Sequence, residues 1–238
     1  GASLADYNND SLIDVYISNY VAYKKGAPTY ERNKGFVSNE VSFDATLYDP
    51  LPNKLYLNEE NFKFRDTTES AGVGDGRGRS LGAHWTDLNA DGWQDLIVIN
   101  DVDSPNQVYL NDSGVSFTLS EAQYSLIETP ESHDLLEDDF DNDGINEMLI
   151  TQNGGAAPIF AARASGGTEK FSDKAWVSGI ADRRNLNVVN WGAASGDFNN
   201  DGNVDLYIAN GDLKPDLDSP FVAQAQHNQI LLGLGNGK

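Results

Sequence analysis

Residues 197–211, "DFNNDGNVDLYIANG", contain the pattern that decides the fold. Three aspartates and one asparagine occupy positions 1, 3, 5 and 9 of this stretch, which runs directly into the apolar residues Leu206 to Ala209. Carboxylates held this close together repel one another. The stretch therefore predicts a tight turn whose negative charge is neutralised by another group, followed by a β-strand.

The same pattern occurs in three other places: "DYNNDSLIDVYIS" from Asp6, "DLNADGWQDLIVIN" from Asp87 and "DFDNDGINEMLIT" from Asp139. The intervals between the first aspartates are 81, 52 and 58 residues. Self-similarity at such a period is the signature of a repeat architecture. The chain is therefore a repeat array of units of fifty-odd residues, with an insertion in the first interval.

A second repeated element follows each acidic stretch. It reads "NKLYLN" at Asn53, "NQVYLN" at Asn106 and "NQILLG" at Asn228, with "PIF" from Pro158 as a degenerate version. Each unit thus contains short β-branched or aromatic runs bounded by Gly, Asn and Asp, which is typical of strands joined by turns. We predict an all-β fold, a β-propeller of four-stranded blades, with about four blades in one region spanning residues 1–238.

Composition excludes several classes of function. The chain has 16 Lys and Arg against 37 Asp and Glu, a net charge of −21, which disfavours nucleic acids and anionic lipids as partners. Cysteine is absent, so no disulfide or thiolate site is present. No apolar run approaches the roughly 18 residues that a membrane span requires.

Alternating oxygen-bearing side chains in a tight loop are typical of calcium sites, because calcium takes about six to eight oxygen ligands at flexible geometry. Positions 1, 3, 5 and 9 would supply side chains and position 7 a backbone carbonyl, while glycine at position 6 allows a left-handed turn. The first loop has Ser11 instead of that glycine, so we expect it to be the weakest or most strained site, because positive φ is unfavourable for a residue other than glycine. The predicted ligands of up to four calcium ions are Asp6, Asn8, Asp10, Leu12 and Asp14; Asp87, Asn89, Asp91, Trp93 and Asp95; Asp139, Asp141, Asp143, Ile145 and Glu147; and Asp197, Asn199, Asp201, Asn203 and Asp205.

The alternative is that these residues only form turns, since Asx-turns need no metal. The turn interpretation does not by itself require an acid at position 9, yet all four loops have one, and together they contain thirteen carboxylates. Four divalent ions would reduce the net charge from −21 to −13. We therefore favour metal binding, and calcium over magnesium because the ligand sets are large and anionic.

The stretches "WGAASGDFNNDGNVDLYIANG", "NQVYLND" and "FKFRDTTESAGV" resemble the FG-GAP/VCBS repeats of the ASPIC/UnbV (cartilage acidic protein-like) family. The resemblance covers nearly the whole chain. It implies a seven-bladed propeller with calcium in its loops, related to the integrin α-subunit head. On this comparison we expect the chain to be part of a longer propeller, truncated at both ends.

We expect a non-enzymatic function: an extracellular, cell-surface or periplasmic module that binds a protein or glycan, or assembles with itself, in adhesion or in a matrix or fibre. The alternative is a secreted polysaccharide lyase or dehydratase that uses His84, His133 or His227 with Tyr20, Tyr23 or Tyr30. None of these residues forms a recognisable catalytic motif, so we predict no catalytic residues. His84 is expected to be structural, and His133 and His227 to lie on the surface.

Two other features have functional interpretations. The insertion at residues 19–49 is the best candidate for specific recognition, because long loops on rigid scaffolds often carry function. Asn111 and Asn9 each begin a glycosylation sequon, the second inside a predicted metal loop.

Overall fold

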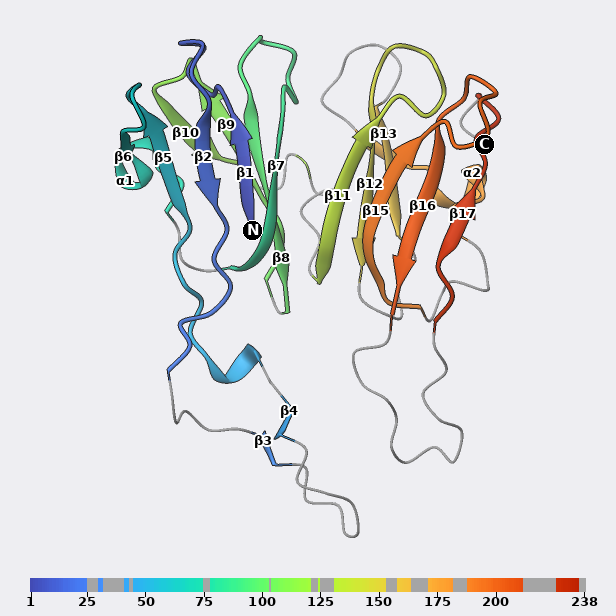
Figure 1. Cartoon of the computed structure of the whole chain (residues 1–238), viewed down its shortest axis with the longest axis horizontal. Coiled ribbons are helices and arrows are strands. Elements are labelled where there is room, and N and C mark those ends of the chain that lie inside the picture. Colours follow the sequence, from blue (N-terminus) through green and yellow to red (C-terminus); the bar gives the residue numbers. More distant parts are fainter. Residues whose placement is uncertain are drawn as a thin grey trace.

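A computed structural model describes residues 1–24, 30–31, 41–42, 45–74, 78–102, 104–120, 124, 131–152, 158–163, 171–181, 188–211 and 226–235. Apart from one two-stranded hairpin, its strands form four antiparallel sheets that stand side by side (Figure 1). Each sheet corresponds to one repeat of the sequence. The predicted all-β fold of propeller blades is thereby confirmed.

The first three blades have four strands each and the fourth has three among the described residues. Blade 1 consists of β1 (Ala2–Ala5), β2 (Asp14–Ile17), β5 (Lys54–Asn58) and β6 (Phe64–Asp66); blade 2 of β7 (Arg79–Thr86), β8 (Asp95–Asp101), β9 (Gln107–Asp112) and β10 (Ser116–Leu119); blade 3 of β11 (Ser132–Asp138), β12 (Glu147–Gln152), β13 (Ile159–Arg163) and β14 (Phe171–Asp173); and blade 4 of β15 (Asn190–Gly196), β16 (Asp205–Asn210) and β17 (Gln229–Leu231). The degenerate "PIF" element forms β13, as predicted.

The first strand of each blade lies on the inner side of the array, and neighbouring first strands contact one another. Short helices follow the fourth strands of blades 1 and 3: α1 (Thr68–Ala71) and α2 (Ala175–Ser178). A minor hairpin, β3 (Tyr30–Glu31) and β4 (Val41–Ser42), and the 3-10 helix η1 (Ala45–Leu47) belong to the first-repeat insertion. The rest of that insertion, residues 25–29, 32–40 and 43–44, lies outside the described residues, as do the surroundings of the Tyr30 side chain.

The hydrophobic core lies between adjacent blades, so the sheets of blades 2 and 3 are covered on both faces by their neighbours. Blades 1 and 2 enclose a cluster around Tyr16, Leu55 and Leu96, and blades 3 and 4 enclose one around Phe160 and Leu206. A third cluster fills the space between blades 2 and 3. Strands buried on both faces are the reason that β8 and β12 read as nearly continuous apolar runs.

The asparagine that opens the third strand of a blade links that blade to the next. The Asn100 amide N–H donates to Asn106 Oδ1 at 2.9 Å, and Asn106 Nδ2 donates to Ser132 Oγ of blade 3 at 2.9 Å. Asn53 makes the same two bonds from blade 1, with Asn19 N and with Ser80 Oγ of blade 2. The repeated asparagine thus holds adjacent blades in register.

No helix among the described residues has the length and apolar character needed to cross a membrane.

Candidate metal centre

The four acidic loops lie at the same end of the four sheets, each joining the first and second strands of its blade (Figure 1). Every loop is closed by a strand pair in which the residue before position 1 faces position 9. These pairs are Ala5 with Asp14, Thr86 with Asp95, Asp138 with Glu147, and Gly196 with Asp205. The spacing seen in the sequence is therefore the spacing of one β-hairpin turn, repeated four times.

The side chains at positions 1, 3 and 5 accept hydrogen bonds from the loop backbone. In the fourth loop, Asp197 accepts from the N–H groups of Asp201 and Gly202 at 3.0 and 2.9 Å. Asn199 Oδ1 accepts from Asp201 N at 2.8 Å, and Asp201 Oδ1 accepts from Asn203 N at 2.9 Å. The same four bonds occur in the other three loops. These bonds explain the fold of the loop without a metal.

The acid at position 9 is buried and fixes the loop to the sheet. Asp95, which is fully buried, accepts Leu88 N–H at 2.9 Å through Oδ2 and Asn111 N–H of the third strand at 2.7 Å through Oδ1. Asp14 and Asp205 make the same pair of bonds, and Glu147 makes the first of them. This structural role was not predicted, although the acid before each of the four apolar strands could have indicated it.

For Asp14, Asp95 and Glu147, the backbone N–H donors do not fully compensate the carboxylate for its loss of water. Burial raises the pKa of Asp95 to about 6, with smaller contributions from the charges of Asp91 and Asp87. Burial raises the pKa of Glu147 to about 7, helped by the charge of Asp141, and also raises the pKa of Asp14. Ionisation of these groups is therefore less favourable in the cation-free protein than in water, and a bound cation would stabilise the ionised forms.

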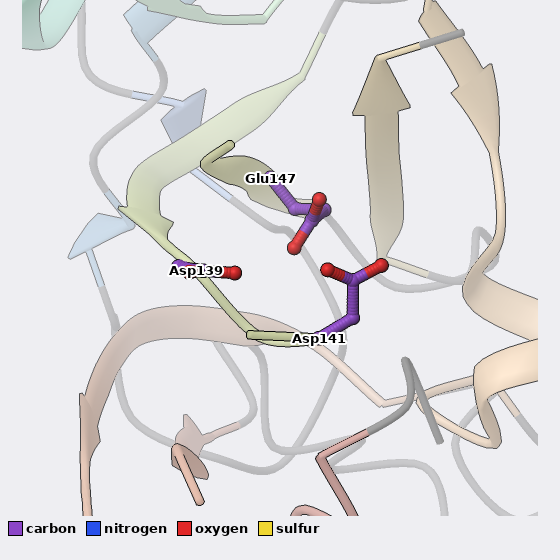
Figure 2. Close-up of side chains that lie close together, drawn as sticks. All are labelled: Asp139, Asp141 and Glu147. Atoms are coloured by element: carbon purple, nitrogen blue, oxygen red, sulfur yellow. The ribbon is translucent and has the colours of Figure 1, made fainter. Parts of the chain in front are cut away.

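Three carboxylates converge in the third loop. Asp139, Asp141 and Glu147 each place an oxygen within 4.8 Å of the other two, and their side chains point toward one another in Figure 2. Glu147 is only 4% exposed. Burial and the neighbouring Asp143 raise the pKa of Asp141. Among the described residues this is the only such group of acidic or histidine side chains.

The other three loops have asparagine at position 3, and its Nδ2 donates to the position-5 aspartate at 2.9 Å in each. The atoms that these loops offer to a metal are all oxygens: the carboxylates at positions 1, 5 and 9 and the amide oxygen at position 3. Such a ligand set suits a hard cation such as calcium. At position 7 the backbone N–H of Leu12, Trp93, Ile145 or Asn203 donates to the position-5 aspartate. Coordination by the carbonyls of these residues stays a prediction.

The backbone turns left-handed at two positions of each loop. At position 6, Gly92, Gly144 and Gly202 have φ between 86° and 89°, and Ser11 has φ 70°, which confirms the expected strain in the first loop. Position 4 is also left-handed, as in Ala90 at φ 60°. This second left-handed position was not predicted, although the other three loops carry asparagine there, a residue that tolerates the conformation.

The histidines do not form a shared site among the described residues. His84 Nε2 lies 2.7 Å from Glu137 Oε2 and so links blades 2 and 3, in agreement with a structural role. His227 is exposed as expected. The expectation for His133 was wrong: it is 7% exposed, its ring stacks on Trp191 at 4.3 Å between centroids, and Nδ1 lies 2.7 Å from the Asn190 carbonyl. The polar sequence around it hid this burial, because β11 is packed against β15.

The asparagines of both glycosylation sequons, Asn111 and Asn9, use their side chains in hydrogen bonds to other parts of the chain. Asn111 is buried, its Nδ2 donates to the carbonyls of Tyr7 and Gln94, and its Oδ1 accepts from Gly114 N. A glycan on Asn111 would require these bonds to break. Asn9 is exposed, and its Nδ2 donates to the Gly92 carbonyl at 3.3 Å.

Comparison with known proteins agrees with this geometry. Residues 139–208 match the family model of the FG-GAP-like repeat. The match begins at position 1 of the third acidic loop and ends in β16, so it spans the acidic loops of blades 3 and 4. No curated protein matches the chain at a significant level.

Proposed function

We propose that this chain is a calcium-binding propeller module of the ASPIC/UnbV type that acts outside the cytosol, without enzymatic activity, in adhesion, ligand binding or surface assembly. The convergence of Asp139, Asp141 and Glu147 within 4.8 Å carries the proposal. The four-fold repetition of the loops and the net charge of −21 extend it to the other blades.

Calcium would supply positive charge at the point where buried carboxylates lack it. Hydrogen bonds between neighbouring loops would then couple the calcium-bound conformation of one loop to the next. Asn9 Nδ2 donates to the Gly92 carbonyl of the second loop, and Asn142 Nδ2 donates to Asn203 Oδ1 of the fourth. Fixing one loop therefore also restricts its neighbour.

The calcium affinity expected of these loops bears on where the protein acts. Extracellular calcium modules bind at about 10⁻⁴ to 10⁻³ M, whereas cytosolic sensors bind at about 10⁻⁷ to 10⁻⁵ M. Loops that are exposed at positions 4 to 6 and already hydrogen-bonded internally suit the weaker class. Such sites fill only where calcium is plentiful, which supports a location outside the cytosol.

The test is calorimetric titration of the chelator-treated chain with calcium and with magnesium, together with thermal unfolding in each. We expect saturable binding selective for calcium and a rise in melting temperature that corresponds to about 2.7 kcal/mol for a site at a hundredfold excess over its Kd. Asp141→Asn converts the third loop to the pattern of the others and should weaken that site. Asp112→Asn, at an exposed carboxylate outside the loops, is the matched control.

Absence of saturable calcium binding, or equal responses to calcium and magnesium, would contradict the proposal. The choice among ligands needs a second experiment. Sedimentation of the calcium-loaded chain at high concentration should reveal oligomers if self-assembly is the function. A monomer that binds a protein or glycan on an array would favour adhesion instead.

A further inference from the structure

The acidic loops of blades 1 and 2 are joined by buried hydrogen bonds that run from one position-9 carboxylate to the other. Asp14 Oδ2 accepts the Tyr7 N–H at 3.3 Å, and the Tyr7 carbonyl accepts Asn111 Nδ2 at 2.9 Å. The Asn111 N–H donates to Asp95 Oδ1 at 2.7 Å. Three consecutive bonds therefore connect a predicted calcium ligand of the first loop with one of the second.

Both polar atoms of the Asn111 side chain have partners. The residue is 5% exposed, and besides its bond to Tyr7 the Nδ2 donates to the Gln94 carbonyl at 2.8 Å. The Oδ1 accepts the Gly114 N–H at 2.7 Å. One side chain thus contacts position 2 of the first loop and position 8 of the second, so a movement of either loop disturbs the bonds to the other.

The turn between β9 and β10 packs between the same two loops. Gly114 lies in this turn at φ 75°, and a methyl group added to it would lie 2.9 Å from Cα of Asn8 and 2.7 Å from the Trp93 ring. Asn8 is position 3 of the first loop and Trp93 is position 7 of the second. This packing is a second link between predicted ligand residues of the two sites.

The loops of blades 3 and 4 lack the buried bridge. Gly233 occupies the repeat position of Asn111, since its N–H donates to Asp205 Oδ1 at 2.8 Å as the Asn111 N–H does in blade 2. Glycine has no side chain with which to reach the third loop. An exposed bond of 3.3 Å from Asn142 to Asn203 joins those two loops at the surface. The chain therefore contains one pair of loops with the bridge and one pair without it.

We propose that the first two calcium sites form a cooperative pair, in which Asn111 couples the loops so that an ion in the second helps to fill the strained first loop. The inference rests on the calcium binding proposed above. The first ion would fix Asn111 and Tyr7, so the second ion would not have to order them, and this difference gives positive coupling. Two cations repel each other, so coupling of favourable sign has to come from the shared contacts.

The test is a calcium titration of the chelator-treated full chain, followed by amide NMR. Each loop has its own reporter, the position-6 N–H that donates to the position-1 aspartate: Ser11, Gly92, Gly144 and Gly202. Asp91→Asn removes one ligand charge from the second loop but keeps an oxygen to accept the Trp93 N–H. We expect this change to raise the calcium concentration at the Ser11 midpoint by about 5- to 10-fold and to leave the Gly202 midpoint unchanged.

Asn111→Gly copies the residue of blade 4, so it removes the bridge and keeps the main-chain N–H. In this background Asp91→Asn should no longer move the Ser11 midpoint. Asn58→Gly is the matched control, because Asn58 has the same position in blade 1 and its Nδ2 donates to the Ile13 carbonyl of its own loop at 3.0 Å. With Asn58→Gly, the Ser11 midpoint should still respond to Asp91→Asn.

A reciprocal measurement leaves Asn111 unaltered. Asp10→Asn in the first loop should raise the Gly92 midpoint, because coupling between two sites acts in both directions. A Ser11 midpoint that stays constant or falls with Asp91→Asn would overturn the coupling and leave calcium binding intact. An equal shift with and without the Asn111 side chain would also overturn it. If no reporter responds to calcium, the proposed function fails and the coupling fails with it.

Discussion

Substitution of Ala90 by asparagine or glycine should stabilise the protein, since this residue is held at φ 60° in the second acidic loop. A left-handed conformation costs an ordinary L-residue about 1–2 kcal/mol, and asparagine and glycine tolerate it best. Asn9, Asn142 and Asn200 occupy the same position in the other loops, at φ 56°, 61° and 59°. We expect Ala90→Asn and Ala90→Gly to raise the free energy of unfolding by about 0.5–1 kcal/mol.

The measurement is urea unfolding, repeated with chelator and with calcium, and supported by thermal unfolding. In a chain of this size about 1 kcal/mol corresponds to roughly 2–4 °C in Tm. Ala90→Val is the opposite control, because a β-branched residue tolerates positive φ poorly, and it should lower stability. Asn142→Ala should lower the free energy of unfolding by about as much as Ala90→Asn raises it. Unchanged or lower stability of Ala90→Asn and Ala90→Gly would refute the backbone argument.

Three further predictions concern the loops and the blade contacts. Burial raises the pKa of Asp95 to about 6 and that of Glu147 to about 7, so protonation of these groups favours the folded cation-free chain. The free energy of unfolding of that chain should therefore fall by up to ~3 kcal/mol per group as pH rises from 4 to 7. Urea unfolding curves measured in saturating calcium should show no such fall. Asn106→Ala should cost about 1–3 kcal/mol in the same assay, because it leaves buried partners unsatisfied, whereas exposed Asn228→Ala should cost less than about 1 kcal/mol. Ser11→Gly should raise the calcium-free melting temperature by about 2–4 °C by relieving φ 70°.

Periodicity in the sequence was sufficient to predict the blades, because each repeat must bury its apolar strands against a neighbouring repeat. The acidic loops and their left-handed glycines could also be predicted, because the spacing of residues within one turn determines the geometry of that turn. The burial of His133 could not be read, since it depends on contact with Trp191, 58 residues away. The two bonds made by Asp95 were equally hidden, because one of them comes from Asn111 on a different strand.

The hydrogen bonds also change which residue argues most strongly for a metal. At position 9 one N–H group approaches from the loop and another from the third strand, so a carboxylate is needed there even without a cation, as in Asp95. At position 3 one acceptor oxygen suffices, and asparagine supplies it while its Nδ2 stabilises the position-5 aspartate, as Asn89 does for Asp91.

Asp141 has no Nδ2 and so cannot donate to the position-5 aspartate as Asn89 does. Instead it adds a charge beside two other carboxylates in the third loop. Burial and Asp143 raise its pKa, so the cation-free loop opposes the ionised form. The hydrogen bonds of the turn therefore account for the other position-3 residues but leave this carboxylate unexplained. Since a cation would turn the repulsion into attraction, Asp141→Asn separates the two interpretations: it should stabilise the cation-free chain and weaken calcium binding, whereas a residue that only formed the turn would leave calcium binding unchanged.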